Sequence, residues 1–223
     1  MKVCTDACIF GAWISAEVRG NELREMSCLD IGAGTGLLSL MLAQKNSFEI
    51  DAIEIESNAF EQAKENFKNS PWSEQLKIFK ADAKEFLSPK KYDLIISNPP
   101  FFENDLLSTQ ENTNIAKHNA ALTLSDLLSV IKNNISEHGK FAIILPYPRT
   151  DYFEKLVNEN KFHLNKKLLI KQTPTHNFFR SILLFSKKKT TVEVSELIIK
   201  NEKGNYTQEF TELLKDYYLN LNF

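Results

Sequence analysis

The chain has 223 residues, of which 43% are hydrophobic and 25% are charged, and its formal net charge is −2. These values are ordinary for a globular protein that can bury a large core. No signal peptide opens the chain and no run approaches about 18 apolar residues, which excludes secreted and membrane-spanning classes and predicts a cytosolic protein. The three cysteines, Cys4, Cys8 and Cys28, lack CxxC or Cys/His spacing, so we expect reduced thiols and no metal site.

The basic residues are concentrated in one part of the chain. Eight of the 27 lie between Lys161 and Lys189, a stretch that contains no Asp or Glu, so all 29 acidic residues lie elsewhere. An acidic body with one basic segment predicts a polyanionic partner that docks on one face. The alternative is a solvated edge hairpin whose lysines prevent aggregation.

The first predicted elements are a helix, a strand and a glycine-rich turn. Asp6 is expected to cap a helix that runs to about Val18 and packs inward through Ile9, Ala12, Trp13 and Ala16. Cys28–Ile31 reads as a strand, and the turn after it has three glycines in the pattern G-x-G-x-G: Gly32, Gly34 and Gly36. An apolar helix follows, so the glycines stand where a backbone can approach a ligand closely.

The acid before this turn narrows the class of ligand. Asp30 lies two residues before the first glycine, and a carboxylate there disfavours a phosphate but suits a cationic or hydroxyl-bearing ligand. The glycine spacing also differs from the G-x-G-x-x-G of folds that bind the pyrophosphate of a dinucleotide. A nicotinamide oxidoreductase is therefore disfavoured.

Two further strands are predicted to end in acids. The strand over residues 48–55 carries Glu54 at its end, a position that typically holds the ribose hydroxyls of an adenosine; a solvated carboxylate is the alternative. A helix is predicted over residues 58–69, and a third strand over residues 76–81 ends in Asp82-Ala83. Asp82 is suited either to accept a hydrogen bond from an adenine amino group or to cap a helix.

A fourth strand, residues 92–96, leads into Ser97-Asn98-Pro99-Pro100-Phe101-Phe102. Each proline keeps the residue before it out of the helical region and removes one backbone N–H donor. The result is a stiff turn rich in acceptors, suited to a flat group with an exocyclic NH₂ and a ring face for stacking. A proline-rich turn followed by core phenylalanines is the alternative. In a parallel doubly wound sheet, all four strand ends meet at the ligand-binding edge.

The second half of the chain is predicted to complete the fold. Residues 103–122, which include Lys117 and His118, are expected to form a long loop on the substrate side. Thr123 and Asp126 predict a capping box that opens a helix with Ile135 among its inward residues. The remaining predicted elements are a strand over 141–145, a helix over 150–160, a hairpin over 163–171 and 179–185, a strand over 192–200 and an amphipathic helix from Thr207.

These motifs together resemble the S-adenosylmethionine-dependent methyltransferases. The resemblance rests on Asp-x-Gly-x-Gly-x-Gly at residues 30–36, on Glu54 and Asp82, and on Asn-Pro-Pro-Phe at residues 98–101. It implies an α/β fold with a doubly wound, seven-stranded, mostly parallel Rossmann-like sheet, an antiparallel last strand and a C-terminal helical tail. It also implies one methyltransferase domain over residues 1–223, with a helical segment (1–25), a catalytic core (26–186) and a C-terminal strand and amphipathic helix (187–223).

The ends of the chain are similar to one family in particular, the bacterial tRNA1(Val) (adenine(37)-N6)-methyltransferases. The similarity lies in Met-Lys-Val-x-Thr-Asp at residues 1–6 and in Gly-Asn-Tyr-Thr at residues 204–207 with the aromatic helix after it. It implies methyl transfer to the exocyclic N6 of the adenine 3′ of the anticodon. Members of that family are expected to carry a short segment before Met-Lys-Val, so we expect this chain to lack part of the rim of the RNA site.

The resemblance assigns a role to each candidate residue. The residues expected to bind S-adenosylmethionine are Asp30, Gly32 and Gly34 on the methionine side, Glu54 at the ribose, Asp82 and Ala83 at the adenine, and Asn98. The expected catalytic residues are Asn98, Pro99, Pro100 and Phe101: the Asn98 side chain and the Pro99 carbonyl accept the two N6 hydrogens, and Phe101 stacks on the base. The residues expected to bind RNA are Lys117, Lys166, Lys167, Lys171, Arg180, Lys187, Lys188 and Lys189.

Three alternatives remain open at this point. A ribosomal-RNA guanine-N2 methyltransferase shares Asn-Pro-Pro-Phe. A protein glutamine-N5 methyltransferase shares Asn-Pro-Pro but usually has a helical domain before the glycine turn, where this chain has only about thirty residues. A non-catalytic RNA-binding homologue is expected to have a damaged pocket, and the intact acids and Asn98 speak against it.

Overall fold

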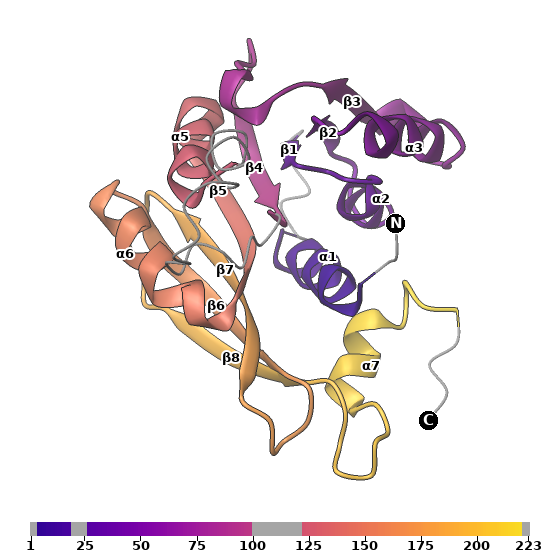
Figure 1. The fold of residues 1–223 in the computed structure, drawn as a ribbon, viewed down its shortest axis with the longest axis vertical. Coiled ribbons are helices and arrows are strands. Elements are labelled where there is room, and N and C mark those ends of the chain that lie inside the picture. The colour runs from indigo at the N-terminus through magenta and orange to yellow at the C-terminus, as the bar shows by residue number, and fades with distance from the viewer. Residues whose placement is uncertain (1–3, 19–25, 100–121, 220–223) are drawn as a thin grey trace, which may run out of the picture.

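The computed structural model describes residues 4–18, 26–99 and 122–219. Within them, eight strands form one sheet with helices on both of its faces (Figure 1). The strands are β1 (Ser27–Ile31), β2 (Glu49–Glu54), β3 (Leu76–Lys80), β4 (Tyr92–Ser97), β5 (Ile135–Pro146), β6 (His163–Lys171), β7 (Phe178–Ser186) and β8 (Glu193–Ile198). The α-helices are α1 (Thr5–Val18), α2 (Leu37–Ala43), α3 (Ser57–Lys68), α5 (Leu124–Asn134), α6 (Thr150–Glu159) and α7 (Gln208–Leu214).

The strand order is β3-β2-β1-β4-β5-β7-β6-β8. The first five strands of this order run parallel, β7 is antiparallel to both β5 and β6, and β8 is parallel to β6. The predicted fold class is therefore confirmed, although the described residues contain eight strands where seven were expected. The additional strand is β8, which continues the sheet beyond β6 instead of belonging only to a C-terminal tail.

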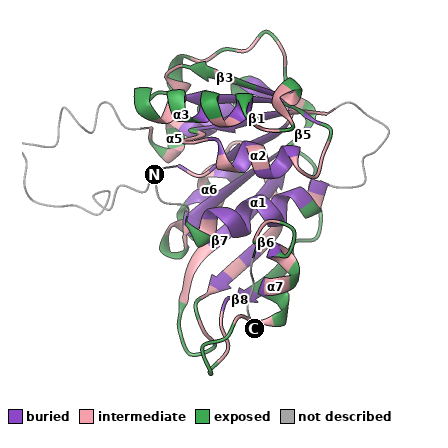
Figure 2. Cartoon of the chain, turned by 90° about the vertical axis from the view of Figure 1, so that its right-hand side faces the viewer, coloured by how far each residue is buried: buried purple, intermediate pink, exposed green. Residues whose placement is uncertain are grey.

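Two apolar clusters hold the helices to the sheet. One joins α1, α2 and α7 to one face of the sheet, and the other joins α5 and α6 to the opposite face. Helix α1 is buried along most of its length and lies between α2 and α7, with which it shares one apolar cluster (Figure 2). Ala16, expected to pack inward, is exposed. No helix in the part of the chain that the structure describes is long and apolar enough to cross a membrane.

Most predicted elements are present, and the differences have local causes. The capping box of Thr123 and Asp126 is formed at the start of α5, as predicted. Ile135, expected inside that helix, instead begins β5, because the helix ends at Asn134 and the chain becomes extended. Helix α7 begins after Thr207, whose side chain accepts a hydrogen bond from the N–H of Phe210, but it ends at Leu214, earlier than its periodicity suggests.

Candidate functional site

The ends of three parallel strands stand side by side at one edge of the sheet. Ile31 at the end of β1 is paired with Ile53 of β2 and with Ser97 of β4. The residues that come next in the chain are Gly32, Glu54 and Asn98. The register thus brings three of the predicted site residues to one level of the sheet, at the edge where α/β folds bind ligands.

The glycine turn is held against the end of β2. The backbone N–H groups of Gly32 and Ala33 both donate to the carbonyl oxygen of Ile53, each at 3.0 Å. Gly34 N–H donates to Glu54 Oε2 at 2.8 Å. The third glycine of the turn, Gly36, has a φ of +83°. These bonds fix the turn before any ligand binds, which reduces the entropy lost on binding.

The glycines at the two ends of this turn have different reasons to be glycine. A Cβ on Gly32 would meet no atom within 4 Å, so the backbone there borders open space. A Cβ on Gly36 would lie 2.3 Å from Cε1 of the Phe67 ring, so that position is closed by packing against α3. Gly32 is therefore the residue at which a ligand can approach the backbone, whereas Gly36 is required by the fold.

Glu54 is buried and both of its carboxylate oxygens already accept backbone hydrogen bonds. Oε2 accepts from Gly34 N–H and Oε1 accepts from Glu56 N–H, each at 2.8 Å. A carboxylate offers about four lone-pair positions, so each oxygen can accept one more donor. The two bonds orient the carboxylate and leave it able to bind a pair of hydroxyls.

Asp30 lies fully buried beneath the glycine turn. Its Oδ2 accepts a hydrogen bond from Ser39 Oγ at 2.7 Å, and its Oδ1 has no hydrogen-bond partner among the described residues. Burial raises the pKa of Asp30 to about 7, against a lowering effect of the Ser39 hydrogen bonds and with a further rise from the negative charge of Glu54. Asp30 Oδ1 is thus a buried acceptor without a partner in the described part of the chain, and Glu54 is a second acid near the same open turn. Two acids at this place fit a cationic, hydroxyl-bearing ligand such as S-adenosylmethionine.

Asp82 caps a short helix at the end of β3. Its Oδ1 accepts from Lys84 N–H at 2.9 Å, and the 3-10 helix Ala83–Glu85 begins there. The capping alternative weighed for Asp82 is thus correct, and contact of Asp82 and Ala83 with an adenine stays a prediction. Both residues are partly exposed.

The turn after β4 is fastened to β1 directly before Asn98. Ser97 Oγ donates to the carbonyl oxygen of Ile31 at 2.9 Å inside the core. Asn98 is partly exposed and Pro99 is buried. Pro100 and Phe101 lie outside the described residues, as do residues 103–121 of the predicted substrate-side loop, which include Lys117 and His118.

Several residues that support this site were not predicted from the sequence. Ser39 is one of them, and its signal was available: it is the only polar residue in the otherwise apolar α2. Asn66 Nδ2 donates to Thr35 O at 2.9 Å and so ties α3 to the glycine turn. Ile55 follows Glu54 directly and is 58% exposed, which leaves an apolar surface beside the acid that the strand pattern did not reveal.

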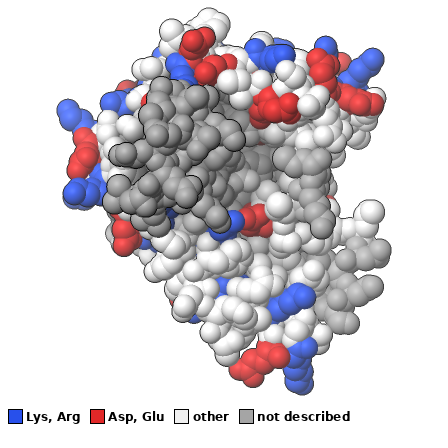
Figure 3. Space-filling view, in the orientation of Figure 1, with Lys and Arg blue, Asp and Glu red and all other residues white. Residues whose placement is uncertain are grey.

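Among the described residues, the predicted RNA-binding cations do not form one free basic surface. Five of them are paired with acids from other elements: Lys166 with Glu17 and Glu193, Lys167 with Glu154, Lys171 with Glu196, Arg180 with Asp6, and Lys187 with Glu137. On the described part of the face in Figure 3, acidic and basic side chains alternate and no continuous basic area is visible. Residues 161–189 contain no acids themselves, but the fold places acids from other elements next to their lysines and arginine.

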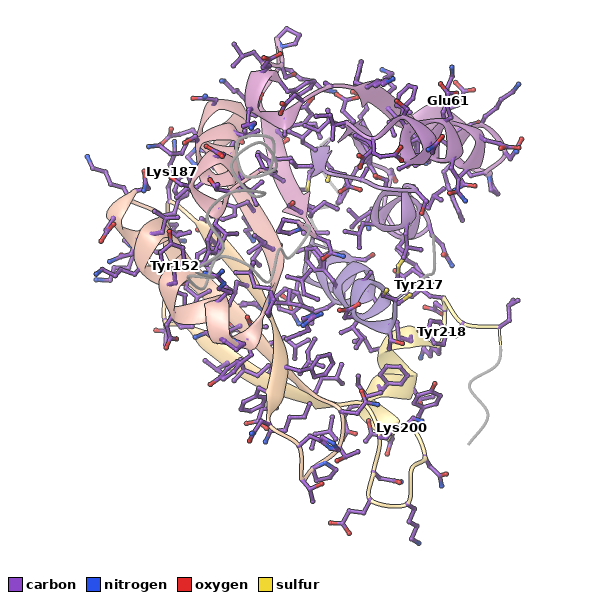
Figure 4. The ribbon with its side chains drawn as sticks, in the orientation of Figure 1. Glu61, Tyr152, Lys187, Lys200, Tyr217 and Tyr218 are labelled. Carbon is purple, nitrogen blue, oxygen red and sulfur yellow. The ribbon has the colours of Figure 1, made fainter. Side chains whose placement is uncertain are left out.

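The direction of β7 also divides the segment between two edges of the sheet. Because β7 is antiparallel to β5, Arg180 at its start pairs with Pro146, whereas Ser186 at its end pairs with Lys140. Lys187 therefore lies at the edge opposite to Asn98, and Lys188 and Lys189 follow it (Figure 4). The segment therefore presents its cations at two edges and not along one docking surface. Contact with RNA stays a prediction; from this arrangement we expect it for the cations at the Asn98 edge and not for Lys187, Lys188 and Lys189.

Comparisons with known proteins show the family to which the chain belongs. Residues 16–145 match the family model of the methyltransferase small domain. A tRNA1(Val) (adenine(37)-N6)-methyltransferase of Flavobacterium psychrophilum is 39% identical over 99% of this chain and 94% of its own length. The enzyme of the same name from Pseudoalteromonas translucida is 34% identical over 99% of this chain and 93% of its own length.

Among solved structures, a predicted O-methyltransferase from Agrobacterium tumefaciens aligns with a TM-score of 0.72 at 16% identity, over 94% of this chain and 95% of that one. At that identity the likeness shows the shared fold alone. The relatives carry more information, since they match nearly the whole chain at 34% and 39% identity. The chain belongs to the methyltransferase small domain family and, within it, to the family of the tRNA1(Val) (adenine(37)-N6)-methyltransferases.

Proposed function

We propose that this protein transfers the methyl group of S-adenosylmethionine to the exocyclic N6 of an adenine in tRNA, namely adenine 37 of tRNA1(Val), the substrate that the names of its relatives give. The observation that carries the proposal is the row of Gly32, Glu54 and Asn98 at one edge of the sheet. In this row, the glycine turn would hold the cofactor, Glu54 would accept the ribose hydroxyls and Asn98 would accept the target amino group.

The cofactor side uses groups that the fold has already oriented. When bound, S-adenosylmethionine supplies a methyl group that is activated by its positive sulfonium. Glu54 would accept the two ribose hydroxyls with the lone pairs that Gly34 and Glu56 leave free. Asp30 would place negative charge below the methionine portion, and Asp82 with Ala83 would contact the adenine.

The target side needs acceptors and no strong base. The lone pair of an adenine N6 is delocalised into the purine ring, so this nitrogen is a poor nucleophile. Asn98 and the carbonyl oxygen of Pro99 would accept its two hydrogens and favour a pyramidal nitrogen whose lone pair points at the methyl group. The same two oxygens would stabilise the positive charge that develops on N6 during transfer.

The region of tRNA that is bound and the place of action are parts of this proposal. Because position 37 lies next to the anticodon, the anticodon loop is the part of tRNA that must reach Asn98. Single-stranded loop bases suit such a site, since no duplex has to be unpaired before one base is splayed out. The expected cytoplasmic location goes with that substrate.

The test is methylation of bulk tRNA from cells that lack the modification, followed by mass spectrometry of the nucleosides. We expect N6-methyladenosine that depends on both the protein and S-adenosylmethionine. Formation of N2-methylguanosine on ribosomal RNA, or methylation of protein glutamine without any change in tRNA, would support one of the alternatives instead. No methylated product with any of these substrates would contradict the proposal.

A further inference from the structure

Two aromatic rings and a lysine meet at the same sheet edge as Asn98, at the ends of the three strands that follow β4 in the sheet order. Ser97 is paired with Ile143 of β5, and Tyr147 follows the end of that strand. Phe178 begins the next strand, β7, and pairs with Lys171 at the end of β6. Because Ser97 is level with Ile143, the group also lies three to four residues beyond Asn98 along the strand direction. With about 4.8 Å between adjacent strands and about 3.3 Å per residue, it lies on the order of 15 Å from Asn98. We call Tyr147, Phe178 and Lys171 the aromatic ledge.

An irregularity in the pairing of β6 and β7 aims the ledge to one face of the sheet. Ile170 pairs with Arg180, but the next residue, Lys171, pairs with Phe178, so Phe179 is an extra residue in β7. Phe179 packs against the apolar cluster that includes α1, and Arg180 forms its ion pair with Asp6 at the start of α1. The extra residue sends Phe178 to the opposite face, where it meets Tyr147. Such bulges commonly re-aim side chains beside active sites.

Tyr147 and Lys171 each contact Phe178, and none of the three side chains is buried. The ring centroids of Tyr147 and Phe178 are 5.3 Å apart at an angle of 46°, and Lys171 Nζ lies 4.2 Å from the centroid of Phe178. Tyr147 is 39% exposed, although it is a large aromatic residue with a core next to it. A pair of rings that served only to close the core would be expected to be buried.

The ion pair of Lys171 leaves this lysine available to another anion. Lys171 Nζ lies 3.5 Å from Glu196 Oε2, and the Glu196 side chain is 53% exposed. Partly exposed pairs of this kind contribute little to stability and are weakened by salt, so a phosphate can replace the carboxylate at low cost.

We propose that the aromatic ledge binds a nucleotide next to the target adenine, with its base stacked on Tyr147 and Phe178 and its phosphate facing Lys171. This inference rests on the proposed function, because it requires a single-stranded RNA segment whose target base occupies the Asn98 turn. Stacking on aromatic rings combined with a nearby cation is how proteins hold single-stranded nucleic acid without strict sequence reading. The ledge thus positions the loop, and the Asn98 turn selects the base that is methylated.

The first test replaces the rings and measures the methylation kinetics with tRNA. In Tyr147→Leu and Phe178→Leu, we expect KM for tRNA to rise about tenfold, the usual scale for the loss of one stacked base, while the Kd for S-adenosylmethionine stays unchanged. Tyr147→Phe keeps the ring and should behave like the wild type. The matched control is Tyr152→Leu, an exposed tyrosine of α6 (Figure 4) that is 54% accessible and is not part of the ledge.

The second test reports stacking directly and needs no turnover. An anticodon stem–loop with 2-aminopurine in place of the nucleotide beside the target adenine should lose fluorescence when it binds to the wild type, and lose less when it binds to Tyr147→Leu. Glu196→Gln removes the acid that competes for Lys171, so it should strengthen binding of this RNA, whereas Lys171→Gln should weaken it. The matched control for the lysine is Lys187→Gln at the opposite edge.

The outcomes separate the ledge from the proposed function. If the wild type methylates tRNA and both leucine variants keep its KM and its fluorescence response, the ledge is overturned and the function stands. If the wild type forms no N6-methyladenosine in tRNA, the proposed function itself fails. A leucine variant that no longer binds S-adenosylmethionine is taken as not folded. In that case the test rests on Glu196→Gln and Lys171→Gln, and equal RNA affinity of these two variants would overturn the ledge.

Discussion

The two halves of the sheet differ in how strand direction distributes residues that are close in sequence. In the parallel half, from β3 to β5, every strand ends at the same edge. Gly32, Glu54 and Asn98, which are far apart in sequence, therefore lie next to one another. In the other half, β7 runs against its neighbours, and the segment from Lys161 to Lys189 is divided between the two edges. In the parallel half, residues at the ends of strands can therefore be predicted to share a site. In the antiparallel half, residues that are close in sequence cannot be predicted to share a surface.

The largest effect is expected from the amide acceptor of the parallel half. Asn98→Ala should lower kcat for tRNA methylation by roughly a hundredfold or more, because a positioned polar group acts on the transition state. Its Kd for S-adenosylmethionine should stay close to that of the wild type, since Glu54 and the glycine turn are intact. Near-normal turnover in this variant would remove Asn98 from the catalytic role.

The glycine turn allows a comparison of two chemically identical substitutions. Gly36→Ala places a Cβ against the Phe67 ring and keeps a positive φ, so we expect a loss of roughly 2–4 kcal/mol in the free energy of unfolding. Gly32→Ala has the same backbone cost but open space around the Cβ, so we expect a loss of about 1 kcal/mol. Urea denaturation measures both, and equal losses would contradict the assignment of different roles to the two glycines.

The buried acid under the turn should make stability depend on pH. The pKa of Asp30 is raised from 3.8 to about 7, so the folded protein holds this proton more tightly than the unfolded chain does. The contribution of the group to stability is therefore complete below about pH 4 and is lost as pH rises through 7, with a slope of at most about 1.4 kcal/mol per pH unit. Asp30→Asn should lack this dependence. The measurement is the free energy of unfolding of variant and wild type across pH 4–8, and the difference between them should change with pH. A constant difference would contradict the raised pKa.

The smallest effect is expected at the far edge of the antiparallel half. Charge reversal of Lys187, Lys188 and Lys189 should leave tRNA affinity and its salt dependence almost unchanged, because these residues lie at the edge opposite to Asn98. Lys171→Glu should weaken tRNA binding and flatten the log–log salt dependence by roughly 0.7, the value for one single-strand phosphate. If the triple reversal weakened binding more than Lys171→Glu, the RNA would lie on the far edge.

The parallel half could be predicted from sequence because local signals mark each strand end. Gly32, Asp82 and Asn98 each come shortly after a predicted strand and Glu54 ends one, and in a parallel sheet all strands end at the same edge. The support of the site was less visible: Asn66 reaches the glycine turn from α3, and nothing in its neighbourhood along the chain indicates that contact.

The antiparallel half could not be predicted in the same way because its features depend on residues far apart in sequence. The acids that neutralise the basic segment include Asp6 and Glu17 from α1. The bulge at Phe179 depends on the register between two strands, which is not encoded in either strand alone. Charge counted along the chain therefore overstates the basic surface that the fold exposes.

The central claim is that the carboxyl edge of the parallel half is a site for S-adenosylmethionine. The most direct measurement is calorimetric titration of the wild type and Glu54→Ala with S-adenosylmethionine, its demethylated product and NADH. The account predicts that the first two ligands bind to the wild type, that Glu54→Ala weakens both by about tenfold or more through loss of the ribose hydrogen bonds, and that NADH does not bind. Binding of NADH without any binding of S-adenosylmethionine would contradict it.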